Sequence, residues 1–83
     1  MPFAVLVQFY GYPVSGGYDL RGLPEQLVTR IEAARKHTYP SHVGMNQVPI
    51  YEMLNWIEAS GCGWTLHSAA AGSQHSQLYV FHA

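Results

Sequence analysis

The sequence is poor in cysteine and in charged residues, and both shortages limit what the chain can be. Cys62 is the only cysteine, so no disulfide can form within the chain, and this usage favours a reducing compartment. Charged residues make up 11% of the sequence, against about 25% in an average soluble domain. A chain of 83 residues also buries only about 60% of its unfolded surface, which leaves a marginal core. We therefore expect the chain to gain stability and to cover weakly polar surface as a homo-oligomer.

Basic segments and long apolar runs are also missing. The net charge is −1 and no basic stripe is present, which argues against a nucleic-acid partner. No apolar run reaches the ~18 residues of a membrane span. The apolar stretch 3–10 follows no positively charged region and precedes no clear cleavage site, so it indicates a strand and not a signal peptide. We expect a cytoplasmic protein with neither nucleic acid nor membrane as a partner.

Three segments have the composition of β-strands. Residues 3–10 are rich in β-branched and aromatic residues, which favours a largely buried strand. Residues 62–70 alternate, with Trp64 and Leu66 on the side of Cys62 and with Thr65 and His67 on the other. Residues 77–82 also alternate, so a small, polar loop at 71–75 predicts an antiparallel hairpin. Residues 18–20 give a weak signal for a further strand, and residues 43–48 fit either a connector or a middle strand.

Two proline-led segments are predicted to be helices. Pro24 and Glu25 suit a helix start, and Pro40 stops the helix after Tyr39. Its inward face consists of Leu27, Val28, Ile31 and Ala34. Pro49 opens the second helix, and Gly61 ends it. In this second helix the apolar residues follow the spacing i, i+3, i+4 and i+7 and so form a single face, which consists of Ile50, Met53, Leu54 and Ile57.

These elements predict one domain over residues 1–83 with an α+β fold. We expect a small antiparallel sheet with two helices packed on one face, in the order β-(β)-α-β-α-β-β.

No motif in the sequence predicts catalysis or a bound cofactor. His67, His75 and His82 fall in or beside the last hairpin, but no histidine pair at helical spacing, cysteine pair or nearby acidic ligand accompanies them. Exposed strand histidines are the favoured interpretation, and a pH-sensitive interface is the alternative. Cys62 alternates with apolar residues and is predicted to lie in the core. The glutamates have the spacing of solvated helix faces, so we expect a non-enzymatic protein without metal or cofactor.

Several segments resemble the feedback regulatory proteins of GTP cyclohydrolase I. The chain begins MPF and runs directly into an apolar strand, and PEQL at residues 24–27 opens the first helix. The best match is the run PIYEMLNWIEASG at residues 49–61, and the chain then ends in a small-residue turn and the strand YVFH at residues 79–82. Residues 10–17 differ from the Met-Glu-x-Gly-Pro-Thr segment that the family has after its first strand.

The resemblance implies a regulatory subunit. Members of the family form homopentameric rings that dock on GTP cyclohydrolase I, where phenylalanine favours an activated complex and tetrahydrobiopterin an inhibited one. Ser68, Gly72 and Gln74 match the family's closing Ser and Gly-Gln turn, although an ordinary hairpin turn is the favoured explanation for them. Tyr12, Tyr18 and Trp56 complete the expected ligand and partner interface, because aromatic residues are enriched in interface hot spots.

Two other functions remain open at this stage. The first is a structural adapter of the same fold that binds protein without sensing a ligand, for instance along an exposed sheet edge. The second is a small metal or pterin enzyme.

Overall fold

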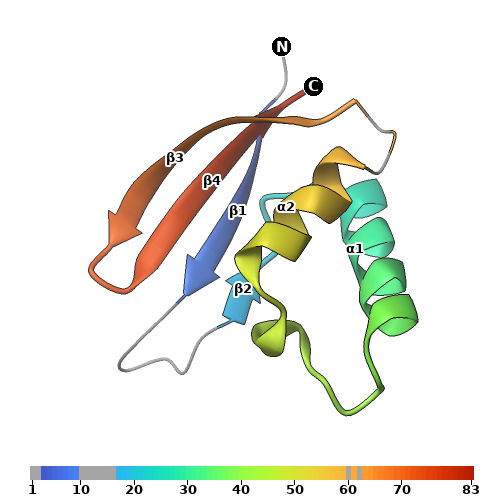
Figure 1. The fold of residues 1–83 in the computed structure, drawn as a ribbon. Helices are drawn as coiled ribbons and strands as arrows, with labels where there is room; N and C mark the ends of the chain where they lie inside the picture. Colours follow the sequence, from blue (N-terminus) through green and yellow to red (C-terminus); the bar gives the residue numbers. More distant parts are fainter. Residues whose placement is uncertain (1–2, 10–16, 60, 62) are drawn as a thin grey trace.

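The computed structural model describes residues 3–9, 17–59, 61 and 63–83. Figure 1 shows a sheet of antiparallel strands with both helices on one of its faces, which confirms the α+β prediction. The elements in chain order are β1 (Phe3–Phe9), β2 (Gly17–Asp19), α1 (Glu25–Thr38), the 3-10 turn η1 (Met45–Gln47), α2 (Ile50–Glu58), β3 (Thr65–Ser73) and β4 (Ser76–His82). The strand order across the sheet is β2-β1-β4-β3.

The first and last strands form the middle of the sheet. β1 pairs with β4 over their full length, from Phe3 opposite His82 to Phe9 opposite Ser76. β4 pairs on its other side with β3, as the predicted hairpin requires. The short strand β2 pairs with the second half of β1 and forms one edge, while β3 forms the opposite edge.

The core lies between the sheet and the two helices. Ala4 and Leu6 of β1 and Phe81 of β4 point to the helix side and are buried. The helices bury against them the predicted inward residues Leu27, Ile31, Met53 and Ile57. Leu78 and Val80 fall on the other side of β4 from Tyr79 and Phe81, also as predicted, because neighbouring strand residues point to opposite faces.

Both helices begin and end near the residues that their sequences suggest. Pro24 and Pro49 occupy the N-cap positions, where a missing N–H costs no helical hydrogen bond. Tyr39 is extended, as expected before a proline, and Gly61 has a φ of 76°, which favours glycine. Within the described residues, neither helix has the length and apolar composition needed to cross a bilayer.

Two local features differ from the predicted order and bounds. Residues 43–48 are a connector that contains η1, and the strand predicted between the helices is absent, because the polar groups of this segment bond locally: the Gly44 N–H donates to Gln47 Oε1 and the Val48 N–H to the Met45 carbonyl. Residues 71–73 are also not a loop. They extend β3, because Ala71 and Ser73 pair with β4, and the turn shrinks to residues 74–75. The predicted core position of Cys62 lies outside the described residues.

Candidate interaction surface on the open face of the sheet

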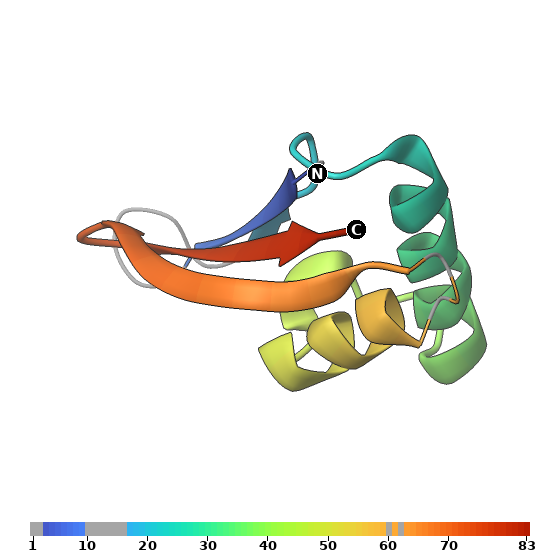
Figure 2. The same cartoon turned by 90° about the horizontal axis from the view of Figure 1, so that it is seen from above.

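The face of the sheet opposite the helices is the candidate functional surface. Figure 2, seen from above, places both helices on the same side of the sheet. The other side, called the open face below, is formed by alternate strand residues and by His67 at a bulge in β3. Its members are Phe3, Val5, Val7 and Phe9 of β1, Ser76, Leu78, Val80 and His82 of β4, Thr65, His67, Ser68, Ala70 and Ser73 of β3, and Gly17 and Asp19 of β2.

The open face is apolar along its central strands. An antiparallel sheet with one face in water normally alternates apolar residues inside with polar residues outside. In β1 the outward positions carry two valines and two phenylalanines, and Leu78 and Val80 lie beside them on β4. Phe3 is 58% exposed, and the other five side chains are half-buried. A contiguous apolar surface of this kind is typical of an interaction site.

Charged side chains are confined to one part of the chain. The four basic and five acidic residues all lie between Asp19 and Glu58. The strands β1, β3 and β4 therefore hold no charged residue at all. Protein interfaces are depleted of charge at their centre and polar at their rim, and the open face has the same distribution.

The one charged residue of the open face, Asp19, stands at its rim on β2. Its carboxylate accepts hydrogen bonds from the main-chain N–H of Arg21 at 3.0 Å and from the guanidinium at 3.0 and 2.8 Å. These bonds stabilise the ionised carboxylate and lower the pKa of Asp19 to about 2. The Arg21 side chain is 91% exposed, so the pair is a solvated rim contact that adds little to stability.

Three rings gather at the end of the open face where β1 starts and β4 ends. The ring centroid of Phe3 lies 5.6 Å from that of His67 and 6.4 Å from that of His82. The two imidazole centroids are 5.7 Å apart with their planes at 87°. Their proximity follows from the register, since Phe3 and Thr65 both pair with His82 and His67 is two residues along β3.

Strand β3 gives the open face an uncharged edge. It is nine residues long and contains neither a charged residue nor proline, the usual protections of an edge strand. Its pairing with β4 shifts register at two places, between Leu66 and Ser68 and between Ala71 and Ser73. Bulges of this kind bend and twist an edge, and so limit pairing with another chain.

The structure separates the residues predicted to form an interface. Tyr18 points to the helix side, where its hydroxyl donates a hydrogen bond to the Val48 carbonyl. Trp56 is half-buried on α2 and meets the ring of Tyr39 edge-on at 6.5 Å. Tyr12 lies outside the described residues. The two described aromatic residues therefore have structural contacts on the helix side, away from the open face.

The other three predicted residues share the β3–β4 hairpin. Ser68 lies on the open face with its Oγ 3.0 Å from Nδ1 of His67, and Gln74 is exposed in the turn. Gly72 lies in the second bulge, where an added Cβ would be 2.7 Å from Ser76 Oγ and 3.1 Å from Leu78 Cγ. Close packing thus accounts for this glycine. Sequence reasoning missed the apolar open face, although the absence of charge from three strands could have indicated it.

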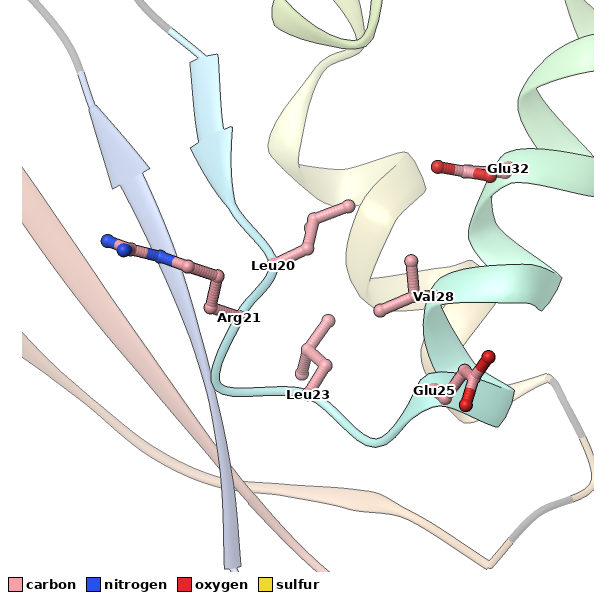
Figure 3. Close-up of a pocket in the computed structure, with 6 residues that line it drawn as sticks. All are labelled: Leu20, Arg21, Leu23, Glu25, Val28 and Glu32. Atoms are coloured by element: carbon pink, nitrogen blue, oxygen red, sulfur yellow. The ribbon is translucent and has the colours of Figure 1, made fainter.

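A pocket of about 450 Å³ lies between α1 and the segment that leads into it. Figure 3 shows its floor, where the aliphatic side chains of Leu20, Leu23 and Val28 converge, while Arg21 points away from them. Glu25 and Glu32 complete the lining. The pocket joins an apolar floor to charged margins, and nothing in its lining pairs an acid with a base for catalysis.

Tyr39 and Glu52 form a polar contact between the end of α1 and α2. The Tyr39 hydroxyl donates a hydrogen bond to the Glu52 carboxylate, which raises the pKa of Tyr39 to about 12. A phenol that holds its proton so strongly is a poor acid or base near neutrality. Within residues 3–9, 17–59, 61 and 63–83, no three His, Cys, Asp or Glu side chains gather closely enough to hold a metal ion.

Comparison of the chain with protein-family models, with curated proteins and with solved structures gave no match.

Proposed function

We propose that this chain is a non-enzymatic, homo-oligomeric subunit that acts by binding other protein chains, and that its copies associate through the open face. The observation that supports the proposal most directly is the open face itself, whose two central strands are apolar and uncharged. Water would contact these side chains in a monomer, whereas association would remove them from water.

A second copy of the chain is the occupant that fits this surface best. An apolar surface without charge is complementary to itself, as a two-fold symmetric contact requires. Two sheets can pack face to face at about 10 Å, with their outward side chains forming a shared core. A stable interface buries about 800 Å² on each partner, which is roughly a sixth of the 5088 Å² surface of this chain.

The test measures the solution mass by light scattering over a dilution series. Variants that carry a new lysine on the open face are compared with one that carries it on α1. Val7→Lys and Val80→Lys place a lysine on the open face, at positions that do not contribute to the buried core. Ala33→Lys adds the same charge to the exposed surface of α1 and serves as the matched control. Circular dichroism establishes that each variant is folded.

We expect an oligomer for the wild type and for Ala33→Lys, and a folded monomer for the two open-face variants, because an unpaired lysine in the contact must be desolvated. A wild-type chain that is monomeric at every concentration would overturn the proposal. Oligomers of wild-type mass in both valine variants would overturn the assignment to the open face.

The resemblance to the feedback regulators supports a more specific form of this function. In that form the oligomer is a pentamer that binds GTP cyclohydrolase I in the cytoplasm, with phenylalanine or a pterin at the contact. A ring of five joins its copies head to tail, so this form would replace the two-fold contact between open faces. Light scattering of the chain mixed with GTP cyclohydrolase I, with and without phenylalanine, tests it. A pentamer whose complex responds to phenylalanine supports the regulator, and an oligomer that does not bind the enzyme leaves the adapter function.

A further inference from the structure

We propose that His67 and His82 form one half of a Zn²⁺ site, and that the same two residues of a second copy complete it across the open face. The inference rests on the proposed function, since it needs two open faces in contact. It concerns the ring cluster at the end of the sheet, where the strand register and the ring contacts place both imidazoles on the open face.

The two imidazoles are held at a separation that suits a shared metal ion. Their ring centroids are 5.7 Å apart. Two imidazoles bound to one tetrahedral zinc have ring centres roughly 5 Å apart, because each Zn–N bond is about 2.0–2.1 Å. The observed separation is therefore close to the one that a shared zinc ion requires. Their positions on paired strands keep them close, with His82 opposite Thr65 and His67 at the neighbouring bulge.

The hydrogen bonds of the rings leave the same nitrogen of each available. Nδ1 of His82 lies 3.2 Å from the main-chain carbonyl oxygen of Ala83, which can only accept, so Nδ1 donates. In the neutral ring the lone pair is then on Nε2. Nδ1 of His67 is also engaged, 3.0 Å from Ser68 Oγ, which can accept its N–H. Metal-binding histidines typically have this arrangement, with one ring nitrogen donating to an outer partner and the other bound to the metal.

One chain supplies only two of the ligands that zinc requires. Structural zinc sites have four protein ligands, and the described residues offer no third His, Cys, Asp or Glu beside this pair. A two-fold symmetric contact between open faces would bring a second pair of imidazoles to the first, because such a contact places identical surfaces opposite each other. The sequence alone favoured exposed histidines without metal, since the closeness of His67 and His82 depends on strand register.

The experiment measures metal stoichiometry and coordination in the full chain. Zinc uptake is followed by competition with a chromophoric chelator, and Co²⁺ serves as a spectroscopic probe because tetrahedral Co²⁺ absorbs far more strongly than octahedral Co²⁺. His67→Gln and His82→Gln remove one ligand each. His37→Gln is the matched control, since His37 is exposed on α1. Light scattering in the presence of a chelator measures association without metal.

We expect one Zn²⁺ for every two chains, a tetrahedral Co²⁺ spectrum, and at least a tenfold loss of zinc affinity in both ligand variants but not in His37→Gln. An oligomer that persists in chelator and takes up no zinc would overturn the metal site and leave the proposed function standing. Zinc bound at one ion per chain, or equally by the ligand variants, would also overturn the shared site. A chain that is monomeric with and without zinc would overturn both proposals.

Discussion

The hydroxyl of Tyr18 donates a hydrogen bond of 2.5 Å to the main-chain carbonyl oxygen of Val48, thirty positions further along the chain. The bond joins the short edge strand β2 to the segment between η1 and α2. Tyr18 is half-buried and Val48 is buried, so water competes little for either group. This contact fixes β2, which has only three residues of its own pairing, to the helical layer.

Tyr18→Phe should lower the free energy of unfolding by about 1–3 kcal/mol, because the buried Val48 carbonyl loses its donor while the packing of the ring is kept. Urea denaturation followed by circular dichroism measures the change. Tyr51→Phe is the control, since Tyr51 is 62% exposed and its loss should cost less than about 0.5 kcal/mol. Equal stability of the two variants would show that the Tyr18 bond does not stabilise the fold.

The same tyrosine should make the fold sensitive to alkali. Burial, followed by the nearby Tyr79, raises the pKa of Tyr18 to about 12, against about 10 in an unfolded chain. The folded state therefore binds this proton more tightly, and the resulting stability is complete below pH ~10 and is lost as the pH rises through about 12. Titration of phenolate absorbance should show two late-titrating tyrosines, Tyr18 and Tyr39, and Tyr18→Phe should remove one of them. An unchanged titration curve at high pH would contradict this assignment.

Asp19 should make the stability of the fold sensitive to acid. Its hydrogen bonds from Arg21 lower its pKa to about 2, against about 3.9 for an unperturbed aspartate. Because the pKa of Asp19 is lower in the folded state, the stability that its ionised carboxylate contributes is present above pH ~4 and is lost as the pH falls through about 2. Carboxyl chemical shifts in an NMR titration give the pKa. Arg21→Gln should raise it toward 3.9, and a value near 3.9 in the wild type would count against the ion pair.

Gly22 is predicted to resist substitution for steric reasons. Its carbonyl accepts a hydrogen bond from the Val5 N–H at 3.0 Å, and a Cβ at this position would lie 2.6 Å from the Val5 carbonyl oxygen. Gly22→Ala should destabilise the fold by about 1–3 kcal/mol, because main-chain atoms of β1 would have to move.

Gly44→Ala is the matched control for Gly22→Ala in thermal denaturation. The added Cβ at Gly44 would meet only the side chain of Asn46, which can rotate away. Its φ of −79° is also compatible with alanine. We therefore expect a clearly lower midpoint for Gly22→Ala than for Gly44→Ala, and similar midpoints would contradict the close approach to Val5.

Local signals in the sequence were sufficient to predict the helices and the hairpin. The spacing of Ile50, Met53 and Ile57 placed α2 and its inward face correctly, and the prolines marked both helix starts. The alternation in β4 also assigned its two faces correctly. These features depend on neighbours within a few residues, which is why the sequence alone contains them.

Features that depend on distant residues were predicted less well. Residues 71–73 are small and have weak strand propensity, yet pairing with β4 holds Ala71 and Ser73 in β3. Residues 43–48 begin and end with a β-branched valine, which favours a strand. The segment forms a turn instead, because the Gln47 side chain and the Met45 carbonyl accept local main-chain hydrogen bonds. The apolar composition of residues 3–10 predicted a largely buried strand. Only the three-dimensional structure reveals that the helices cover just one face of this strand.

The confinement of all charges to residues 19–58 has a consequence for how an assembly of this chain would respond to its surroundings. No charged side chain of β1 or β4 takes part in a contact between these strands, so the apolar part of its strength should depend little on the screening of charges by salt. Its driving force is the removal of apolar surface from water, which weakens on cooling. Such an assembly would tolerate salt and dissociate in the cold.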